Sequence, residues 1–360
     1  MRKILILTNH SYMLYRFRLE LIQELMKEHE MVLSMPYVGH EEDFQALGLR
    51  CIKTDVDRRG INPVTDIKLF HTYQRLLKSE RPDLVITYSI KPNIYGGLAC
   101  SMAGIPYCAN VQGLGTAFQR KGLAQFVTAL YRLALRKAKT VFFENKANAE
   151  EFCRRAIIPA EKETVLPGAG INMERYPYVP YPKNEAVHFL YLGRIMQEKG
   201  MDELFAAMRR LHETYGAGVV LDIVGFYDDD SYKTQVDRLV ADGIAVFHGF
   251  QNDPRPYYAA ADCVVLPSYH EGMSNVLLEA AATGRPVITS DIPGCREAVE
   301  DGKTGALCKV KHADSLYAQM SRMAAMPSTE RQAMGRAGHE KMAREFAKQT
   351  VIEKTRMALA

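Results

Sequence analysis

Two carboxylates, Glu271 and Glu279, stand eight residues apart in the segment 270–282, one on each side of the start of an apolar-periodic helix. We expect Ser274 to cap this helix and four apolar residues to bury its inner face: Leu277, Leu278, Ala281 and Ala282. A helix N-terminus favours an anion such as a diphosphate, and the backbone N–H groups available here belong to Gly272, Met273, Ser274 and Asn275. Because eight helical residues span about 12 Å, one carboxylate can reach the hydroxyls of a sugar while the other reaches a ribose beyond the phosphates. The spacing therefore predicts a nucleotide-sugar site.

A plainer alternative is that Glu271 lies in a solvated loop and Glu279 forms half of a surface ion pair, as most helical glutamates do. The flanking sequence favours the site. Residues 262–268 have the composition of a short buried strand, and residues 284–290 that of a helix stop followed by another strand. This order of elements places the two glutamates at the carboxyl end of a parallel sheet, where open α/β folds bind ligands.

Two cations, Arg194 and Lys199, follow the predicted strand 188–192 and precede a helix that begins near Met201 or Asp202. Both are therefore expected at the ligand end of that strand. A guanidinium offers a planar fork and an ammonium a point charge, and both stabilise the negative charge that grows on a leaving diphosphate. The acidic triplet 228–230 also follows a predicted strand, but such triplets are commonly turns and helix caps, so we expect no metal site there.

The stretch 267–294, with its two glutamates, and the segment 193–200 resemble the retaining glycosyltransferases of family four. The resemblance implies the GT-B fold, an α/β architecture of two Rossmann-like parallel-sheet domains facing a central cleft. It also implies that Glu271, Arg194 and Lys199 are catalytic, and that Glu279 and the backbone of 272–275 join the two cations in binding the donor. Neither a metal nor another cofactor is expected.

Three further segments, 15–18, 91–96 and 112–115, resemble bacterial enzymes of this family that extend polyprenyl-diphosphate-linked glycans for capsule, lipopolysaccharide or protein glycosylation. This narrower resemblance implies an acceptor site in the first half of the chain. The residues that gather the acceptor diphosphate are then His10, Arg16, Arg18 and Lys91, and those that shape the sugar pocket are Asn93, Gly113 and Gly115. The alternative for Arg16 and Arg18 is a place on the surface at the start of a helix.

A conventional general base is missing from the segment 110–120, which contains no Asp, Glu or His. In the family that the chain resembles, many members place a catalytic polar residue there. The leaving phosphate is therefore expected to take the acceptor proton on the same face of the sugar, which gives retention. His10 is the alternative base, since imidazole titrates near neutral pH.

The composition is that of a globular protein, with 360 residues of which 47% are apolar and 24% charged, long enough for two domains. The seven cysteines are odd in number and contain no C-x2-C pair, which predicts a reducing compartment, the cytoplasm. No run approaches the roughly 20 apolar residues of a spanning helix, so any membrane contact is expected to be peripheral, at the cytoplasmic leaflet.

Charge is distributed unevenly: residues 1–170 carry a net charge of +7, residues 171–360 carry −3, and no acid occurs between positions 84 and 143. A basic field of this kind favours a phosphate-bearing acceptor or an anionic membrane surface. Nucleic acid is disfavoured because no binding module is recognisable. The helix expected over 123–138 either presents a solvated basic face or meets lipid through Leu123, Phe126, Val127 and Leu130.

Short apolar strands alternate with helices along the whole chain, beginning with a strand at 3–8 and a helix from about Arg18 to Glu28. A proline-rich linker, 171–186, separates an acceptor-binding domain, 1–170, from a nucleotide-sugar-binding domain, 187–344. The last helix, about 331–359, is expected to weaken near residues 335–338. By resemblance its end, about 345–360, packs back on the first domain.

These expectations describe a cytoplasmic, membrane-associating, retaining hexosyltransferase that moves a hexose or N-acetylhexosamine from a UDP-sugar to a lipid-diphosphate-linked glycan. UDP is favoured over GDP by resemblance alone. Two alternatives stay open. One is a UDP-sugar 2-epimerase of the same architecture, which releases UDP without an acceptor, and the other is a non-catalytic nucleotide-sugar-binding protein.

Overall fold

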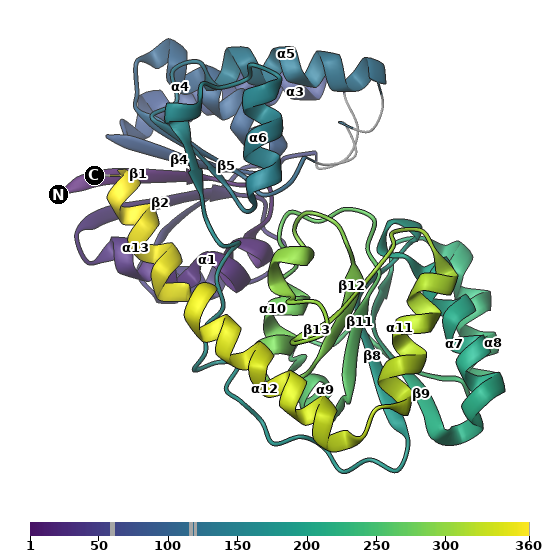
Figure 1. The fold of residues 1–360 in the computed structure, drawn as a ribbon. Coiled ribbons are helices and arrows are strands. Elements are labelled where there is room, and N and C mark those ends of the chain that lie inside the picture. Colours follow the sequence, from purple (N-terminus) through teal and green to yellow (C-terminus); the bar gives the residue numbers. More distant parts are fainter. Residues whose placement is uncertain (58–61, 115–117, 119–120, 360) are drawn as a thin grey trace. The chain divides into compact units, whose positions relative to one another are not determined.

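The computed structural model describes residues 1–57, 62–114, 118 and 121–359 (Figure 1). The chain divides into two compact units. The N-terminal unit comprises Met1–Ala169 and Gln349–Ala360, and the C-terminal unit comprises Gly170–Lys348. The proline-rich segment 171–186 therefore belongs to the C-terminal unit.

A seven-stranded parallel sheet forms the centre of the N-terminal unit, in the order β3-β2-β1-β4-β5-β6-β7. Its strands are β1 Arg2–Leu7, β2 His29–Met35, β3 Arg50–Lys53, β4 Leu84–Tyr88, β5 Tyr107–Val111, β6 Thr140–Phe143 and β7 Glu163–Val165. The central strands are short apolar runs, as expected where helices cover both faces of a parallel sheet.

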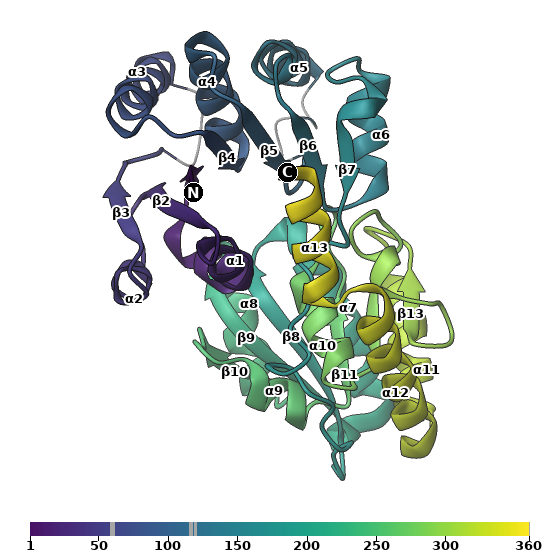
Figure 2. The same ribbon diagram turned by 90° about the vertical axis from the view of Figure 1, so that its left-hand side faces the viewer.

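Helices cover this sheet on two sides and give the unit two hydrophobic cores (Figure 2). On one face lie α3 Pro63–Glu80, α4 Gly97–Ala103, α5 Lys121–Leu135 and α6 Lys146–Arg154. On the other face lie α1 Ser11–Met26, α2 Glu41–Ala46 and α13 Lys348–Leu359. A π-helical segment, Pro92–Gly96, leads into α4.

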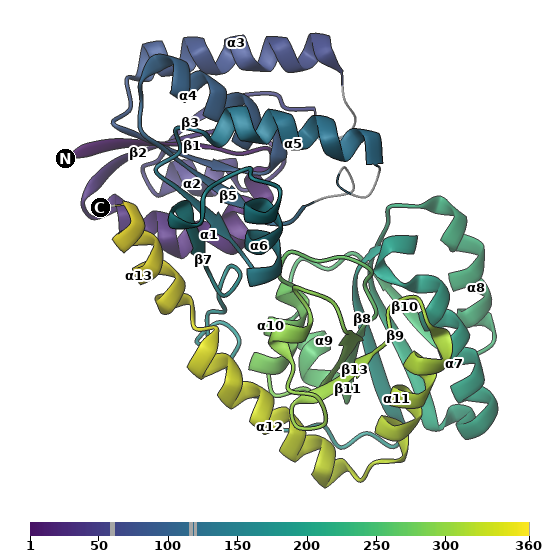
Figure 3. The ribbon, with the colours of Figure 1, turned by 45° about the horizontal axis from the view of Figure 1, so that its top comes forward.

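The C-terminal unit contains a six-stranded parallel sheet in the order β10-β9-β8-β11-β12-β13. Its strands are β8 Val187–Ile195, β9 Val219–Tyr227, β10 Ala245–Gly249, β11 Cys263–Leu266, β12 Val287–Ser290 and β13 Gly305–Cys308. Its helices are α7 Met201–Tyr215, α8 Lys233–Ala241, α9 Arg255–Ala260, α10 Asn275–Ala282, α11 Ala313–Ala325 and α12 Ser328–Glu345. In Figure 3, α7, α8 and α11 lie on one side of this sheet, and α9, α10 and α12 lie on the other.

Helix α1 begins at Ser11, so the prediction of a start near Arg18 is wrong by about two turns. The backbone oxygen of His10 accepts the first intrahelical hydrogen bond, from the N–H of Leu14 at 3.2 Å. The Ser11 hydroxyl is buried and accepts a bond from the N–H of Val38 at 3.0 Å. These contacts fix the first turn through tertiary structure, which local sequence does not reveal.

The C-terminal helical segment breaks at residues 346–347, between α12 and α13, and the prediction of weakness at 335–338 is wrong. Gly335 and Gly338 are buried inside α12. A Cβ at Gly335 would lie 2.1 Å from the backbone oxygen of Gly284, just beyond α10. Glycine at this position therefore allows α12 to pack closely on the unit and does not loosen the helix.

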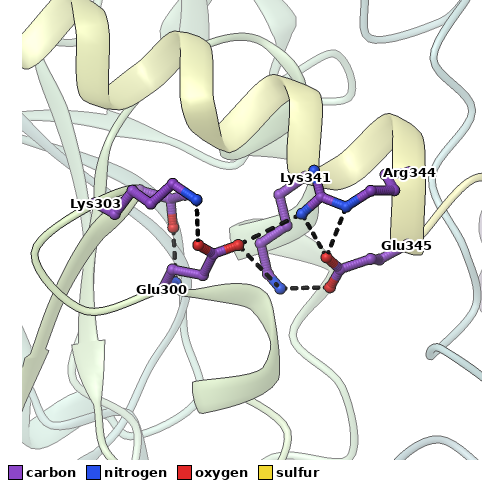
Figure 4. Close-up of polar contacts among 6 residues, drawn as sticks. Glu300, Lys303, Lys341, Arg344 and Glu345 are labelled. Carbon is purple, nitrogen blue, oxygen red and sulfur yellow. Dashed lines mark hydrogen bonds and ion pairs between the residues drawn. The ribbon is translucent and has the colours of Figure 1, made fainter.

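The last turn of α12 is tied to the loop before β13 by a network of ion pairs (Figure 4). Glu300 pairs with Lys303 at 2.7 Å and with Arg344 at 3.5 Å. Glu345 pairs with Lys341 at 2.5 Å and with Arg344 at 2.6 Å. The network fixes the end of α12 just before the break that precedes α13.

Helix α13 completes the second core of the N-terminal unit, although it is encoded at the other end of the chain. Val351, Ile352 and Leu359 are buried in the same cluster as Ile4 of β1. Arg356 reinforces this contact through an ion pair of 3.0 Å with Glu24 of α1. Of the helices in the described part of the chain, none is long and apolar enough to span a bilayer.

Candidate functional site

Lys199 and Glu271 form an ion pair at the carboxyl end of the sheet in the C-terminal unit. The Nζ of Lys199 lies 2.5 Å from Oε1 of Glu271, which also accepts a hydrogen bond from the Ser268 hydroxyl at 2.8 Å. The two side chains are only 17% and 14% exposed. The alternative that Glu271 is a solvated loop residue is therefore wrong.

Close backbone contact holds the two loops that carry this pair. Gly200 has a φ of +74°, and a Cβ there would lie 2.1 Å from the backbone oxygen of Pro267. The N–H of Tyr269 donates to the backbone oxygen of Glu198 at 2.9 Å. Glycine is required at position 200 because both the conformation and the space exclude a side chain. The loop that carries Lys199 is thereby fixed against the loop that carries Glu271.

Helix α10 starts beside this pair, and Ser274 occupies its N-cap position as expected. The side chain of Ser274 makes no capping hydrogen bond, so that part of the prediction is wrong. The backbone N–H of Ser274 donates instead to the backbone oxygen of Gly294 at 2.9 Å. The predicted apolar face is confirmed, since all four members are buried: Leu277, Leu278, Ala281 and Ala282. Met273 and Ser274 are buried, whereas Gly272 and Asn275 are half-buried.

Glu279 lies in α10 and is only 5% exposed, so the alternative that it belongs to a surface ion pair is wrong. Its Oε2 accepts a hydrogen bond of 3.0 Å from the hydroxyl of Tyr258, a fully buried residue of α9. Nothing in the local sequence marks Tyr258 as a site residue. Its distance of 21 residues from Glu279 gives no local signal of the contact.

Arg194 is the second-last residue of β8, whereas the prediction placed it after the strand. Its side chain is 47% exposed, and its guanidinium lies 3.1 Å from the carboxylate of Asp228, which follows the neighbouring strand β9. Asp229 accepts a bond from the N–H of Ser231 at 3.0 Å and so caps a short turn. The triplet 228–230 thus supplies a counter-ion to Arg194 and a cap.

The imidazole of His270, next to Glu271 in the chain, has a shifted pKa. Burial, together with the positive charge of Lys311, lowers the pKa of His270 below its ordinary value. The two predicted cations of the site, Lys199 and Arg194, each lie against a carboxylate. Among the residues that the structure describes, no cluster of three His, Cys, Asp or Glu side chains is arranged to hold a metal ion.

The N-terminal unit has a pocket of about 160 Å³ where β1, β4 and β5 end. Of the predicted acceptor residues, it brings together His10 and Arg18. Its lining residues are Thr8, Asn9, His10, Met13, Leu14, Arg18, Tyr88, Ser89 and Gln112. Arg16 is half-buried in α1 and Gly113 half-buried after β5, and neither lines the pocket. Gly115 lies outside the described residues.

Arg18 is 4% exposed, so the alternative that it lies on the surface at a helix start is wrong. Its Nη2 lies 2.6 Å from Oε1 of Glu144, whose side chain is 9% exposed. The guanidinium also lies 5.4 Å from the ring centroid of Tyr88. Glu144 directly follows the buried strand β6, and that position could have marked it as a residue of the ligand end of the sheet.

The other two predicted acceptor residues are tied into the scaffold. Lys91 lies 2.8 Å from the carboxylate of Asp66 in α3. Asn93 is 1% exposed; it accepts from the Thr87 hydroxyl at 2.6 Å and donates to the backbone oxygen of Asn110 at 2.8 Å. Asn93 therefore holds the π-helical segment against β4 and β5.

Helix α5 presents fewer apolar groups to solvent than the lipid-contact alternative requires. Val127 is buried in the core, and Leu123 and Leu130 pack against it. Of the four proposed lipid contacts, Phe126 is exposed, at 51%. Leu133 adds a second exposed apolar side chain on this helix.

Comparison with known proteins places the chain in a family. Residues 3–145 match the model of glycosyl transferase 4-like domains, and residues 186–326 match that of glycosyl transferases group 1. A Campylobacter jejuni N,N'-diacetylbacillosaminyl-diphospho-undecaprenol alpha-1,3-N-acetylgalactosaminyltransferase is 30% identical over 327 residues, which cover 86% of this chain and 85% of that protein. An Escherichia coli UDP-Gal:alpha-D-GlcNAc-diphosphoundecaprenol alpha-1,3-galactosyltransferase is 27% identical over 281 residues, which cover 74% of this chain and 72% of that protein.

The solved structure of Anabaena HepE in complex with UDP and glucose superimposes with a TM-score of 0.81 at 17% identity, over 100% of this chain and 99% of that one. Two Rossmann-like parallel-sheet units of this kind define a GT-B protein, and the predicted fold class is confirmed. The chain belongs to the group 1 and 4-like glycosyl transferases.

Proposed function

We propose that this glycosyltransferase moves a hexose or N-acetylhexosamine, with retention, from a UDP-sugar to a polyprenyl-diphosphate-linked sugar during the synthesis of a bacterial surface glycan. The observation that carries the proposal is the Lys199–Glu271 ion pair beside the N-terminus of α10. The names of the Campylobacter and Escherichia relatives support the acceptor class, and the latter name supports the UDP-sugar donor.

In this proposal the donor diphosphate replaces carboxylates as the partner of both cations. Glu271 balances Lys199 and Asp228 balances Arg194 in the structure. When the diphosphate binds, Glu271 turns to the sugar hydroxyls, and the N–H groups of 272–275 face the phosphates. Glu279, held by Tyr258, binds the ribose.

The bond between the anomeric carbon and the phosphate oxygen then breaks, and the acceptor hydroxyl forms the new bond to the same face of the sugar. The leaving phosphate oxygen takes the hydroxyl proton, and Lys199 and Arg194 stabilise the charge that develops on UDP. His10 is the alternative acceptor of this proton. No step in this scheme uses a metal ion.

The experiment is a transfer assay with the purified chain, a panel of UDP- and GDP-sugars, and a synthetic polyprenyl-diphosphate-linked sugar, in the presence of a chelator. We expect one UDP-sugar to be consumed only when the acceptor is present, and the anomeric configuration of the product to match that of the donor. Release of UDP without an acceptor would identify an epimerase. Protection by UDP against thermal unfolding with no turnover on any acceptor would identify a binding protein.

The acceptor is carried by a membrane lipid, so we propose peripheral association of the enzyme with the cytoplasmic leaflet. Two exposed cations just after α5, Arg136 and Lys137, and the exposed Phe126 within it support this contact. Basic and apolar groups together favour an anionic bilayer surface.

A further inference from the structure

The pocket at the ends of β1, β4 and β5 carries little net charge. Among the described residues that line it, Arg18 has the only permanently charged side chain. Glu144 lies 2.6 Å from that guanidinium, and both side chains are almost wholly buried. Because the two charges cancel at such a short distance, the field that they leave in the pocket is weak, and a doubly charged diphosphate gains little from it.

Neutral polar groups supply the remaining binding chemistry of the pocket. Ser89, Gln112 and Asn9 contribute a hydroxyl and two amides. The Ser89 hydroxyl donates to Oε1 of Gln112 at 3.3 Å, which fixes the orientation of this amide. Ser89 has a φ of +76°, a strained conformation for a residue with a side chain, and such strain is typical of ligand-binding positions.

The size and the apolar lining suit a single ring. The pocket measures about 160 Å³, close to the roughly 150 Å³ of an engineered cavity that binds one benzene molecule. Met13, Leu14 and Tyr88 add apolar surface beside the amides and hydroxyls. This mixture matches a sugar, which offers C–H faces and ring hydroxyls but no charge.

We propose that this pocket binds the ring of an uncharged sugar, the terminal sugar of the acceptor, and that the acceptor diphosphate binds elsewhere. The proposal rests on the proposed function for the identity of that sugar. In this proposal Arg18 does not bind phosphate. It is a positioning residue, and its ion pair with Glu144 forms one side of the pocket without net charge.

Met13 provides a probe for the test because its side chain lines the pocket and carries a methyl group. The full-length chain is labelled with 13C at its methionine methyl groups, and the Met13 signal is assigned with Met13→Leu. N-acetylgalactosamine, galactose and inorganic pyrophosphate are then titrated separately. We expect at least one sugar to shift the Met13 signal, pyrophosphate to leave it unchanged, and Met102, 71% exposed on α4, to respond to none of them.

Two variants sharpen the result. Gln112→Ala should reduce the sugar-induced shift at least threefold, and Gln125→Ala on the exposed side of α5 should leave it intact. The proposal would be overturned if pyrophosphate shifted the Met13 signal and no sugar did. It would also be overturned if none of the three compounds shifted that signal. Protection of the same protein by UDP against thermal unfolding reports on the donor site, so failure of this inference is distinguishable from failure of the proposed function.

Discussion

The hydroxyl of Tyr258 lies 3.0 Å from Oε2 of Glu279, and both side chains are buried inside the C-terminal unit. A buried carboxylate requires hydrogen-bond donors, and each donor that holds it also fixes its orientation. Tyr258 therefore positions the glutamate to which we assign the donor ribose.

Replacing Tyr258 with Phe removes this hydroxyl and keeps the ring. We expect the affinity for UDP to fall about fivefold, the effect of losing about 1 kcal/mol of hydrogen bonding, while turnover at saturating donor stays unchanged. Calorimetric titration with UDP and steady-state kinetics measure the two effects. Tyr257→Phe on the same helix is the matched control. In a Glu279→Ala background, which has no acceptor for the hydroxyl, Tyr258→Phe should have no further effect on UDP binding, and an additive loss would contradict the coupling.

Glu271→Gln should separate chemistry from binding. The variant cannot balance Lys199 as a carboxylate does, so the ammonium is more available to the diphosphate, and we expect UDP affinity to be maintained or increased. Transfer should fall about 100-fold, because the contact to the sugar in the transition state is weakened. Lys199→Gln should instead weaken UDP about tenfold. Equal losses of UDP binding and transfer in Glu271→Gln would refute its assignment to the sugar.

Arg285 holds two helix ends and the proline-rich segment together and is completely buried. Its guanidinium donates to the backbone oxygens of Val179, Pro180, Tyr258, Ala259, Thr283 and Gly284. Arg285→Met leaves these oxygens without their donor, so we expect the free energy of unfolding of the C-terminal unit to fall by about 3–5 kcal/mol. Urea unfolding measures the loss, and Arg296→Met, an exposed ion-pair partner, should change it by less than about 1 kcal/mol.

The pH dependence of stability should reveal a cluster in which Asp222 lies between two histidines. Its carboxylate lies 2.8 Å from Nδ1 of His188 and 2.7 Å from Nε2 of His248. The hydrogen bond with Asp222 raises the pKa of His188 above its ordinary 6.5. Burial alone would raise the pKa of Asp222, but its hydrogen bonds with the two histidines hold it below its ordinary 3.8.

The contribution of His188 to stability is complete below pH 6.5 and is lost as the pH rises through its raised pKa. The contribution of Asp222 is complete above pH 3.8 and is lost as the pH falls through its lowered pKa. Asp222→Asn should therefore reduce the free energy of unfolding most between these two values and less at pH 9. If Asp222→Asn lowered the free energy of unfolding by the same amount from pH 5 to pH 9, the pairing of Asp222 with a protonated His188 would be contradicted.

Binding to anionic vesicles should depend on salt if α5 carries the membrane contact. Raising the salt from about 0.1 M to about 1 M shortens the screening length from about 10 Å to about 3 Å, so sedimentation with phosphatidylserine vesicles should decrease. Arg136→Gln should weaken association at low salt, whereas Lys146→Gln on α6 should not. Association that is unchanged by salt would reject an electrostatic origin.

The fold class could be predicted from sequence because its signals are local. Buried parallel strands are short apolar runs, and α10 is indicated by the apolar periodicity that follows Ser274 and Asn275. Lys199 could be assigned to the ligand end of β8 because it follows that strand within a few residues. The end of the strand itself was predicted too early, so Arg194 was placed after β8 and not inside it.

The partners of the site residues could not be predicted in the same way. Glu144 lies 126 residues from Arg18, and Tyr258 lies 21 residues from Glu279. The local sequence around Arg18 does not show whether this arginine binds a phosphate or is buried against a glutamate. Only the packing of α1 on the sheet distinguishes the two. The early start of α1 and the buried glycines of α12 were missed for the same reason.

Helix α13 makes the N-terminal unit discontinuous along the chain (Figure 1). On the ribosome the first 169 residues emerge without the helix that covers part of their second core. At about 5–20 residues per second, roughly 10–40 s pass before that helix is made. During this interval the part of the second core that α13 covers stays exposed, and exposed apolar surface of this kind favours aggregation of partly folded chains.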